Sequence, residues 1–537
     1  MITFCDVSFC YGEEDAEGGT DACIEGMSFE IRAGECVVLC GRSGAGKSTV
    51  LRLIDGLAPA FYEGTLHGSV TVAGREPAAM TPEQRVRTFG VVFQDPRSQF
   101  FMNSVQDEIA FSAENIGLEP RAVQEKVREA AALLDIEPLL CRTVDALSAG
   151  QKQRVAIAAA LILSPAILIL DEPVSNLDAE GCWILIGLLE EIKRRGTTIV
   201  ISEHRLHAFL EIADSFLHIE HGRAAHRWTA EEFACLPEDE LRRFGFRYPG
   251  MAELPLRCKK IRAAGTMSPA ADAVETPAVS AVEKATTKAA AETAGAKTAS
   301  AEKPEEEMSS ALCVSNVTYL YKPVRAGVNG CGEKDREKDA AGLEPVCGIR
   351  NISLVFPHGS VTALTGENGA GKTTLCKVLC GLLRQKSGSI TLDGRELSCA
   401  ERRRISYFVM QDADYQLYSD SVINELLLGR EGLPDVKRRA EEAIERFRLQ
   451  EVRNRHPASL SGGEKQRVVI AAAYCSDAEV FVFDEPTSGM DGEGLLSMAR
   501  WADMLARAGK TVIIITHDEL LAELACDYRV RLIEMKK

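Results

Sequence analysis

Two glycine-rich loops in the sequence each end in a lysine followed by a hydroxyl residue. One starts at Gly41 and reads Gly-Arg-Ser-Gly-Ala-Gly-Lys-Ser; the other starts at Gly366 and reads Gly-Glu-Asn-Gly-Ala-Gly-Lys-Thr. Glycines let backbone N–H groups converge on phosphate oxygens, the lysine brings positive charge to the β and γ phosphates, and the hydroxyl suits Mg²⁺. A chance glycine-rich turn would explain one copy, but two copies in matching contexts predict phosphate binding. The residues expected to hold nucleotide are Gly41, Arg42, Ser43, Gly44, Ala45, Gly46, Lys47, Ser48 and Thr49 in one loop and Gly366, Glu367, Asn368, Gly369, Ala370, Gly371, Lys372, Thr373 and Thr374 in the other, with Ser48 and Thr373 as Mg²⁺ ligands.

A pair of adjacent carboxylates follows an apolar stretch in each half of the chain. Asp171 and Glu172 form the first pair, and Asp484 and Glu485 form the second. We expect the aspartates to supply the second Mg²⁺ ligand and the glutamates to act as general bases for an attacking water. The alternative is a surface carboxylate, because Asp-Glu-Pro also terminates strands well.

One histidine follows each carboxylate pair at the same distance. His204 lies 204 − 172 = 32 residues after its glutamate, and His517 lies 517 − 485 = 32 residues after its own. A lone histidine is more often structural, but the matched pair after β-branched stretches favours a role in orienting the γ phosphate or the water.

The motifs recur in the same order, which indicates a duplicated domain of about 240 residues. The stretch Leu147–Arg154 recurs as Leu460–Arg467 at an offset of 460 − 147 = 313, and the carboxylates and histidines recur at that offset too. The glycine-rich loops recur at 366 − 41 = 325.

Apolar runs that alternate with helical stretches predict a parallel sheet in an α/β fold for each half. The expected strands are Glu35–Cys40, Ala166–Leu170 and Thr197–Ile201 in the first half and Ser360–Thr365, Val480–Phe483 and Thr511–Thr516 in the second.

The predicted domain boundaries are 2–245 and 311–536, with a linker at 246–310. The segment Ala263–Glu307 contains no aromatic residue, leucine or isoleucine, so it predicts a flexible tether rather than a packed core. The polar segment Pro323–Pro345 is expected to be a surface loop.

Composition excludes several classes of protein. The net charge is 62 − 79 = −17, which disfavours a protein that wraps duplex DNA. The 17 cysteines are odd in number and include no Cys-x-x-Cys pair, so reduced thiols are expected rather than zinc ribbons. The start of the chain has no basic region typical of a signal peptide, and the apolar run Val155–Leu170, broken by Ser164-Pro165, is too short to span a bilayer.

Together these motifs resemble the nucleotide-binding domains of ATP-binding cassette proteins. The resemblance implies two P-loop NTPase domains, each with a RecA-like core, a β subdomain and an α-helical subdomain that carries the signature motif. It also implies further roles: adenine stacking for Tyr11 and Tyr321, contact with Mg²⁺ and water for Gln94 and Gln411, and a loop crossing between halves at Asp178 and Asp491.

In this family two domains pack head to tail, and ATP binds between the P-loop of one and the signature of the other. The resemblance therefore implies a site one, with the first P-loop, and a site two, with the second P-loop. The signature residues are Ser461, Gly462 and Gly463 for site one and Ser148, Ala149 and Gly150 for site two. Ala149 departs from the family's glycine: its methyl group would either crowd the γ phosphate or be accommodated by a small shift, and we expect accommodation.

A second shared pattern narrows the resemblance. Gln99-Phe-Phe, followed by Val105 and Glu108, matches Gln416-Leu-Tyr, followed by Val422 and Glu425. Duplication with helix packing is one explanation. The pattern also resembles the ATPases of energy-coupling-factor (ECF-type) importers of vitamins and metals, and we expect it to open a helix that faces a transmembrane partner.

Three functions remain open on this basis: the ATPase of such an importer, a soluble tandem cassette that acts on ribosomes or nucleic acid, and the ATPase of an exporter. The importer is preferred, and its expected partners are a membrane coupling protein and a substrate-binding membrane protein, with no nucleic acid. The chain is then expected on the inner face of the cell membrane.

Overall fold

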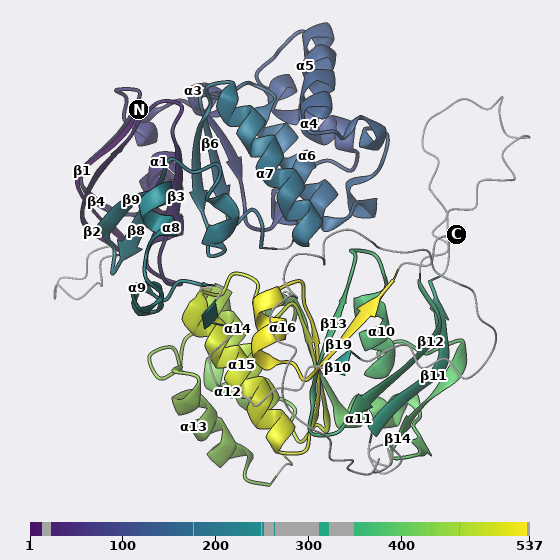
Figure 1. The fold of residues 1–537 in the computed structure, drawn as a ribbon. Coiled ribbons are helices and arrows are strands. Elements are labelled where there is room, and N and C mark those ends of the chain that lie inside the picture. The colour runs from purple at the N-terminus through teal and green to yellow at the C-terminus, as the bar shows by residue number, and fades with distance from the viewer. Residues whose placement is uncertain are drawn as a thin grey trace, which may run out of the picture.

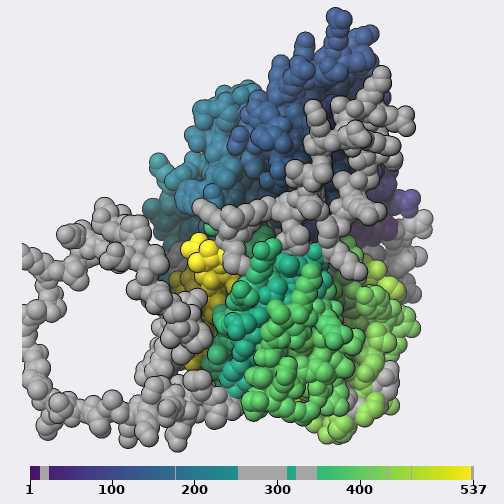
Figure 2. All heavy atoms as spheres, turned by 90° about the vertical axis from the view of Figure 1, so that its right-hand side faces the viewer, coloured from purple at the N-terminus to yellow at the C-terminus, as the bar shows by residue number. Residues whose placement is uncertain are grey.

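The computed structural model describes residues 1–12, 23–175, 177–248, 250–251, 262–263, 311–321, 348–411, 413–430, 432, 434–460 and 462–533. The two sequence repeats form two lobes that contact one another (Figures 1 and 2). The expected fold class is confirmed, because each lobe contains a parallel core sheet, an antiparallel β subdomain and a helical subdomain.

The central strands of each core sheet are short, apolar and buried. The first has the order β5 (Phe89–Val92), β6 (Ile167–Asp171), β7 (Thr198–Ser202), β3 (Cys36–Cys40), β8 (Ser215–Glu220) and β9 (Arg223–Thr229). All its pairs are parallel except β8 with β9. The second has the order β16 (Ser406–Val409), β17 (Val480–Asp484), β18 (Thr511–Ile515), β13 (Val361–Gly366), β19 (Tyr528–Leu532) and β10 (Arg262–Ala263), and all its pairs are parallel. All six strands expected from the sequence are present within one residue at each end.

The antiparallel subdomains pack beside the core sheets. In the first half, β1 (Ile2–Tyr11) lies between β2 (Ile24–Ile31) and β4 (Gly64–Val72). In the second half the order is β12 (Gly348–Pro357), β11 (Ala311–Leu320), β14 (Ser387–Leu392) and β15 (Arg395–Glu396).

Helices cover the sheets and form the signature subdomains. Those of the first half are α1 (Lys47–Ile54), α2 (Leu57–Ala60), α3 (Pro82–Thr88), α4 (Val105–Asn115), α5 (Pro120–Leu133), α6 (Ala149–Leu161), α7 (Ala179–Arg194), α8 (Ala230–Ala234) and α9 (Glu238–Phe244). Those of the second are α10 (Lys372–Leu379), α11 (Cys399–Ile405), α12 (Val422–Leu427), α13 (Val436–Arg446), α14 (Gly462–Tyr474), α15 (Gly492–Arg507) and α16 (Glu519–Ala525). The buried apolar residues of α12–α14 form a cluster of their own, whereas those of α4–α6 belong to a larger cluster that continues into the core sheets.

The start of the predicted linker is packed rather than flexible. Phe246, Tyr248 and Met251 are buried, because they follow α9 into the contact between the halves. Farther on, β10 pairs with β19 at the edge of the second core sheet, the place that β9 occupies in the first. The rest of the predicted tether and the insertion at 323–345 lie outside the described residues.

Among the described residues, no helix is both long and apolar enough to span a membrane.

Candidate functional site

The P-loops connect the central strand of each core sheet to a helix, so their N–H groups lie at the amino end of α1 or α10. Gly41 has a φ of 151°, and a Cβ atom there would lie 2.2 Å from the carbonyl oxygen of Ile219. Gly366 has a φ of 142°, and a Cβ atom there would lie 2.2 Å from that of Leu532. Only glycine fits this approach of loop and neighbouring strand.

The P-loop lysines are buried and close their own loops. The Nζ of Lys47 donates to the carbonyl oxygens of the first two loop residues at 3.1 and 3.0 Å and lies 3.3 Å from Nε2 of His204. The Nζ of Lys372 makes the two equivalent bonds at 2.7 and 3.0 Å. Burial lowers the pKa of both lysines, and neighbouring carboxylates partly offset that effect. Both ammonium groups therefore lie where phosphate would bind.

The carboxylate pair of site one lies at the carboxyl end of β6. The hydroxyl of Ser48 bonds to Asp171, and the Nε2 of Gln94 donates to Oε2 of Glu172 at 2.9 Å. The Nε2 of His204 lies 3.7 Å from Oε1 of Glu172. Burial, with the charges of Glu203 and Asp171, raises the pKa of Glu172 to about 8. The sequence-predicted residues are thus brought together around one carboxylate of unusual basicity.

Site two repeats this arrangement at the end of β17. The hydroxyl of Thr373 donates to Oδ2 of Asp484 at 2.9 Å, and the backbone N–H of His517 donates to Oε2 of Glu485 at 3.3 Å. Burial raises the pKa of Glu485 to about 8 and lowers that of His517 to about 4. Gln411 lies between β16 and the 3₁₀ turn η7 (Ala413–Tyr415).

Backbone strain marks both glutamates. Glu172 has a φ of 45° and Glu485 a φ of 48°, in the left-handed region that residues other than glycine rarely adopt. Such conformations persist where surrounding structure enforces them, often at functional positions.

Residues of the second half complete site one. The backbone N–H of Ser43 donates to Oδ2 of Asp491 at 3.0 Å. A Cβ atom at Gly463 would lie 2.9 Å from Oγ of Ser43, and one at Gly489 would lie 2.9 Å from both Gln94 Nε2 and Glu172 Oε2. The first P-loop therefore faces both the signature and the crossing loop of the other half.

The other family-derived residues are placed as follows. The hydroxyls of Tyr11 and Tyr321 lie 3.2 and 3.4 Å from the hydroxyls of Thr49 and Thr374, so both rings flank their P-loop helices. Ser148 caps α6, in which Ala149 and Gly150 are the first residues, while Gly462 and Gly463 begin α14. Ser461 lies outside the described residues.

The repeated Gln…Glu pattern forms two clamped loops, and here the expectation was wrong in one respect. The helices do begin within the pattern, but later than Gln99 and Gln416: α4 starts at Val105 and α12 at Val422. Gln99 instead bonds back to the backbone of Phe93 and Val91, and Oε2 of Glu108 accepts from the N–H groups of Phe101 and Met102 at 2.9 and 2.7 Å. Gln416 and Glu425 make the equivalent bonds in the second half.

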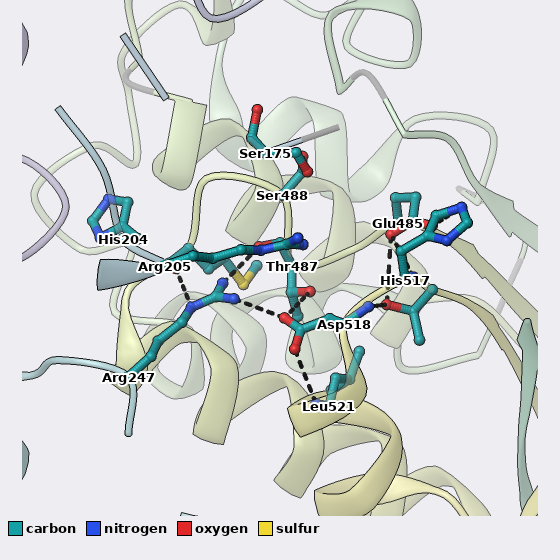
Figure 3. A network of polar contacts seen from close by, with 12 residues as sticks. Ser175, His204, Arg205, Arg247, Glu485, Thr487, Ser488, His517, Asp518 and Leu521 are labelled. Atoms are coloured by element: carbon teal, nitrogen blue, oxygen red, sulfur yellow. Dashed lines mark hydrogen bonds and ion pairs between the residues drawn. The ribbon is translucent and has the colours of Figure 1, made fainter. Parts of the chain in front are cut away.

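Three residues near the sites were missed by the sequence analysis. Oε1 of Glu203 accepts from the N–H of His204 at 2.7 Å. Arg205 and Arg247 lie between the halves, beside Asp518 (Figure 3). Glu203 and Arg205 directly flank a predicted site histidine, which was an available signal; Arg247 carried none.

The two strand–P-loop–helix units, with paired acids and a histidine at the same sheet edge, define a pair of P-loop nucleotide hydrolases. The ABC transporter family model matches residues 24–175 and 349–488. The chain therefore belongs to the ABC transporter family, as an ATP-binding protein with two ATPase cassettes.

Two relatives with known names agree with this assignment. The chain is 35% identical over 519 residues to an ABC transporter ATP-binding protein of Treponema denticola, covering 96% of this chain and 92% of the relative. It is 30% identical over 541 residues to YkoD of Bacillus subtilis, named for HMP/thiamine import, covering 98% and 88%. The solved structure of cbiO1 from Clostridium perfringens, titled as part of the ABC transporter complex cbiONQ, is 28% identical with a TM-score of 0.39, covering 47% of this chain and 97% of that one.

Proposed function

We propose that this chain energises the import of a small solute, a vitamin or a metal ion, through separate membrane subunits. ATP would bind at two sites between the halves. The observation that carries the proposal is the pair of clamped loops, each of which follows a site glutamine in the sequence and exposes an aromatic side chain. The name of YkoD, for HMP/thiamine import, supports import and the vitamin class.

Each site contains the groups that ATP hydrolysis needs. The P-loop N–H groups and lysine hold the β and γ phosphates. Water attacks the γ phosphorus while the bond to the β–γ bridging oxygen breaks, so that ADP and phosphate leave. Glu172 or Glu485, in its ionised form, accepts the proton of that water. His204 and His517 orient the γ phosphate or the water.

The residues present also fit Mg²⁺. Oδ1 of Asp171 is buried and has no hydrogen-bond partner among the described atoms, and the Asp171 and Ser48 oxygens are the type that Mg²⁺ prefers. Thr373 and Asp484 supply the same donors in site two. Gln94 uses its nitrogen on Glu172, which leaves its oxygen for the ion, and Gln411 is its counterpart. Bound there with the phosphates, Mg²⁺ would neutralise charge that develops during transfer.

The clamped loops suit the docking of helices from a membrane partner. Their backbones are fixed at both ends, by the glutamine at one and by the glutamate at the other. Phe101 is 76% exposed and Tyr418 is 77% exposed. Large apolar side chains held out into solvent on a rigid loop are typical of an interaction site. Because Gln94 precedes the first loop and touches Glu172, partner binding and the state of site one can influence each other.

The test is charge substitution at these two positions in the full chain. We expect Phe101→Glu with Tyr418→Glu to reduce co-purification with the membrane subunits by roughly tenfold or more, since buried aromatic anchors dominate interfaces. ATPase activity of the chain without its partner should stay within about twofold. Phe61→Glu and Trp183→Glu, which also replace highly exposed aromatics, serve as controls and should change neither.

The outcomes separate the alternatives. Undiminished partner binding by the double variant would contradict docking at these loops. Uptake of radiolabelled thiamine precursor or metal ion in cells that express the complete system would support import. Efflux that depends on the same chain, or co-sedimentation with ribosomes, would replace the import proposal.

A further inference from the structure

A buried arginine of the first half is bound entirely by acceptors of the second half. Arg247, three residues after α9, is only 6% exposed. Its Nε donates to the carbonyl oxygen of Met490 at 2.9 Å, its Nη2 to that of Thr487 at 2.8 Å, and its Nη1 to Oδ2 of Asp518 at 2.7 Å. Figure 3 shows the guanidinium between these groups.

Two of these acceptors fix the loop that completes site one. The carbonyl groups of Thr487 and Met490 stand on either side of Gly489, which lies against Glu172. The next residue, Asp491, accepts from the first P-loop. Backbone contact reinforces the position of this loop, since the N–H of Gly492, the residue after Asp491, donates to the carbonyl of Gly245 at 2.9 Å.

The third acceptor leads to site two. The backbone N–H of Asp518 donates to Oγ1 of Thr516 at 3.0 Å, and that hydroxyl lies 3.5 Å from Oε2 of Glu485. Oδ2 of Asp518 also accepts from Oγ1 of Thr487 at 3.1 Å. Arg247 is therefore connected to the carboxylate of site two through Asp518, whose side chain binds the arginine and whose backbone binds Thr516.

The chemistry of the contact requires an arginine. Burial alone would raise the pKa of Asp518, but Arg247 and then Arg205 hold it below its ordinary value. A planar guanidinium presents fixed donors to a carboxylate and two carbonyl groups at once, which an ammonium group does not. Removing the guanidinium would take away the main positive charge beside the buried Asp518 carboxylate. It would also leave the carbonyl groups of Thr487 and Met490 without this hydrogen-bond donor.

We propose that Arg247 is a positioning residue for ATP hydrolysis at both sites: it touches neither nucleotide but holds the crossing loop against site one and the Asp518 segment against site two. The proposal rests on the assignment of Glu172 and Glu485 as the bases. The duplication does not provide the reciprocal contact, in which the first half would accept an arginine of the second. The residue 313 positions before Asp518 is Arg205, whose side chain cannot accept a hydrogen bond from a guanidinium group.

The experiment compares Arg247→Lys and Arg247→Met with Arg453→Met in the full chain. Arg453 makes an exposed ion pair with Glu441 within the second half, so its loss is a matched control. Steady-state kcat and KM for ATP are measured well below the melting temperature of each variant. We expect kcat to fall roughly 3- to 30-fold, as energetic coupling of this kind allows, with KM within about twofold because the P-loops are unchanged. Compared with Arg247→Met, the Arg247→Lys variant should recover more of the wild-type melting temperature than of the wild-type kcat.

Each site is then measured alone by repeating the series in a background that silences the other site. Glu485→Gln silences site two and so reports on site one, and Glu172→Gln silences site one and so reports on site two. A fall in both backgrounds supports the proposal. Wild-type kcat in either Arg247 variant, parallel recovery of kcat and melting temperature in Arg247→Lys, or an effect in one background only would overturn it. If Glu172→Gln and Glu485→Gln themselves leave turnover unchanged, the base assignment fails instead. The assay needs no membrane subunit, so it is independent of the import proposal.

Discussion

The two candidate nucleotide sites contain the same predicted catalytic groups but meet the opposite half differently. In site one, Asp491 bonds to the first P-loop and Gly489 lies against Glu172. The carboxylate of Asp178, the counterpart of Asp491, accepts from the N–H of Gly181 of its own helix and from no P-loop N–H in the described part of the chain. Its charge still reaches site two, where it partly offsets the lowering of the Lys372 pKa by burial.

This difference teaches that duplication reproduces local structure more faithfully than it reproduces an interface. P-loops, strand ends and helix caps depend on neighbours close in sequence, and these were copied. The contact between halves depends on residues outside the copied pattern, among them Arg247 in the extension that follows β9 and Asp518 where the first repeat has Arg205. Four predictions test how far the sites differ in action.

The largest effect should come from removing the bases. Glu172→Gln with Glu485→Gln should lower ATP turnover by ~10²–10⁴, the usual contribution of a general base, while ATP still binds. Each single change should remove more than half of the activity if the sites depend on each other, and about half if they are independent. Steady-state ATPase and equilibrium nucleotide binding measure this. Wild-type turnover in the double variant would show that the assignment is wrong.

The crossing loop of site one should be nearly as sensitive. Gly489→Ala adds a methyl group 2.9 Å from Gln94 and Glu172 and strains a backbone with a φ of 71°. We expect turnover to fall roughly 10- to 100-fold, the cost of misplacing catalytic groups by about an ångström. Gly509→Ala is the control, because its φ is 79° but its Cβ would meet nothing within 4 Å. Equal losses in the two variants would assign the effect to backbone strain alone.

Asp491→Ala and Asp178→Ala compare the two crossing loops directly. Both aspartates cap their helices, α15 and α7, so each substitution should cost about 1 kcal/mol of stability. Only Asp491 also binds a P-loop N–H, and a hydrogen bond to a charged group contributes about 1.5–3 kcal/mol. We expect the apparent ATP affinity or turnover to fall about tenfold further for Asp491→Ala. Equal effects in activity assays and melting curves would mean that the sites are equivalent in solution.

Features that depend on nearby residues could be predicted from the sequence, and features that depend on contact between the halves could not. The six strands were placed correctly because each depends on a local apolar run, and the P-loops, paired acids and histidines lie at the ends of those strands, where their roles stay predictions. The helix expected to start at Gln99 starts only at Val105, because the Gln99 side chain bonds to the preceding strand and an irregular loop comes first. The linker boundary was misplaced at Phe246, because its burial depends on a surface of the other half. Arg247 carried no sequence signal for the same reason.

The smallest effect is expected where the signatures themselves differ. Ala149, in the signature of site two, stands where site one has Gly462, and a Cβ atom at Gly462 would meet nothing within 4 Å. The protein surroundings therefore accommodate a methyl group at this position of the repeat. We expect Ala149→Gly and the reciprocal Gly462→Ala to change KM or kcat by a few-fold at most, since one backbone contact of under roughly 1 kcal/mol is adjusted. ATP titrations of both variants and of the double exchange measure it. Complete loss of activity in Ala149→Gly would show that the methyl group is required, and that the two signatures are specialised rather than interchangeable.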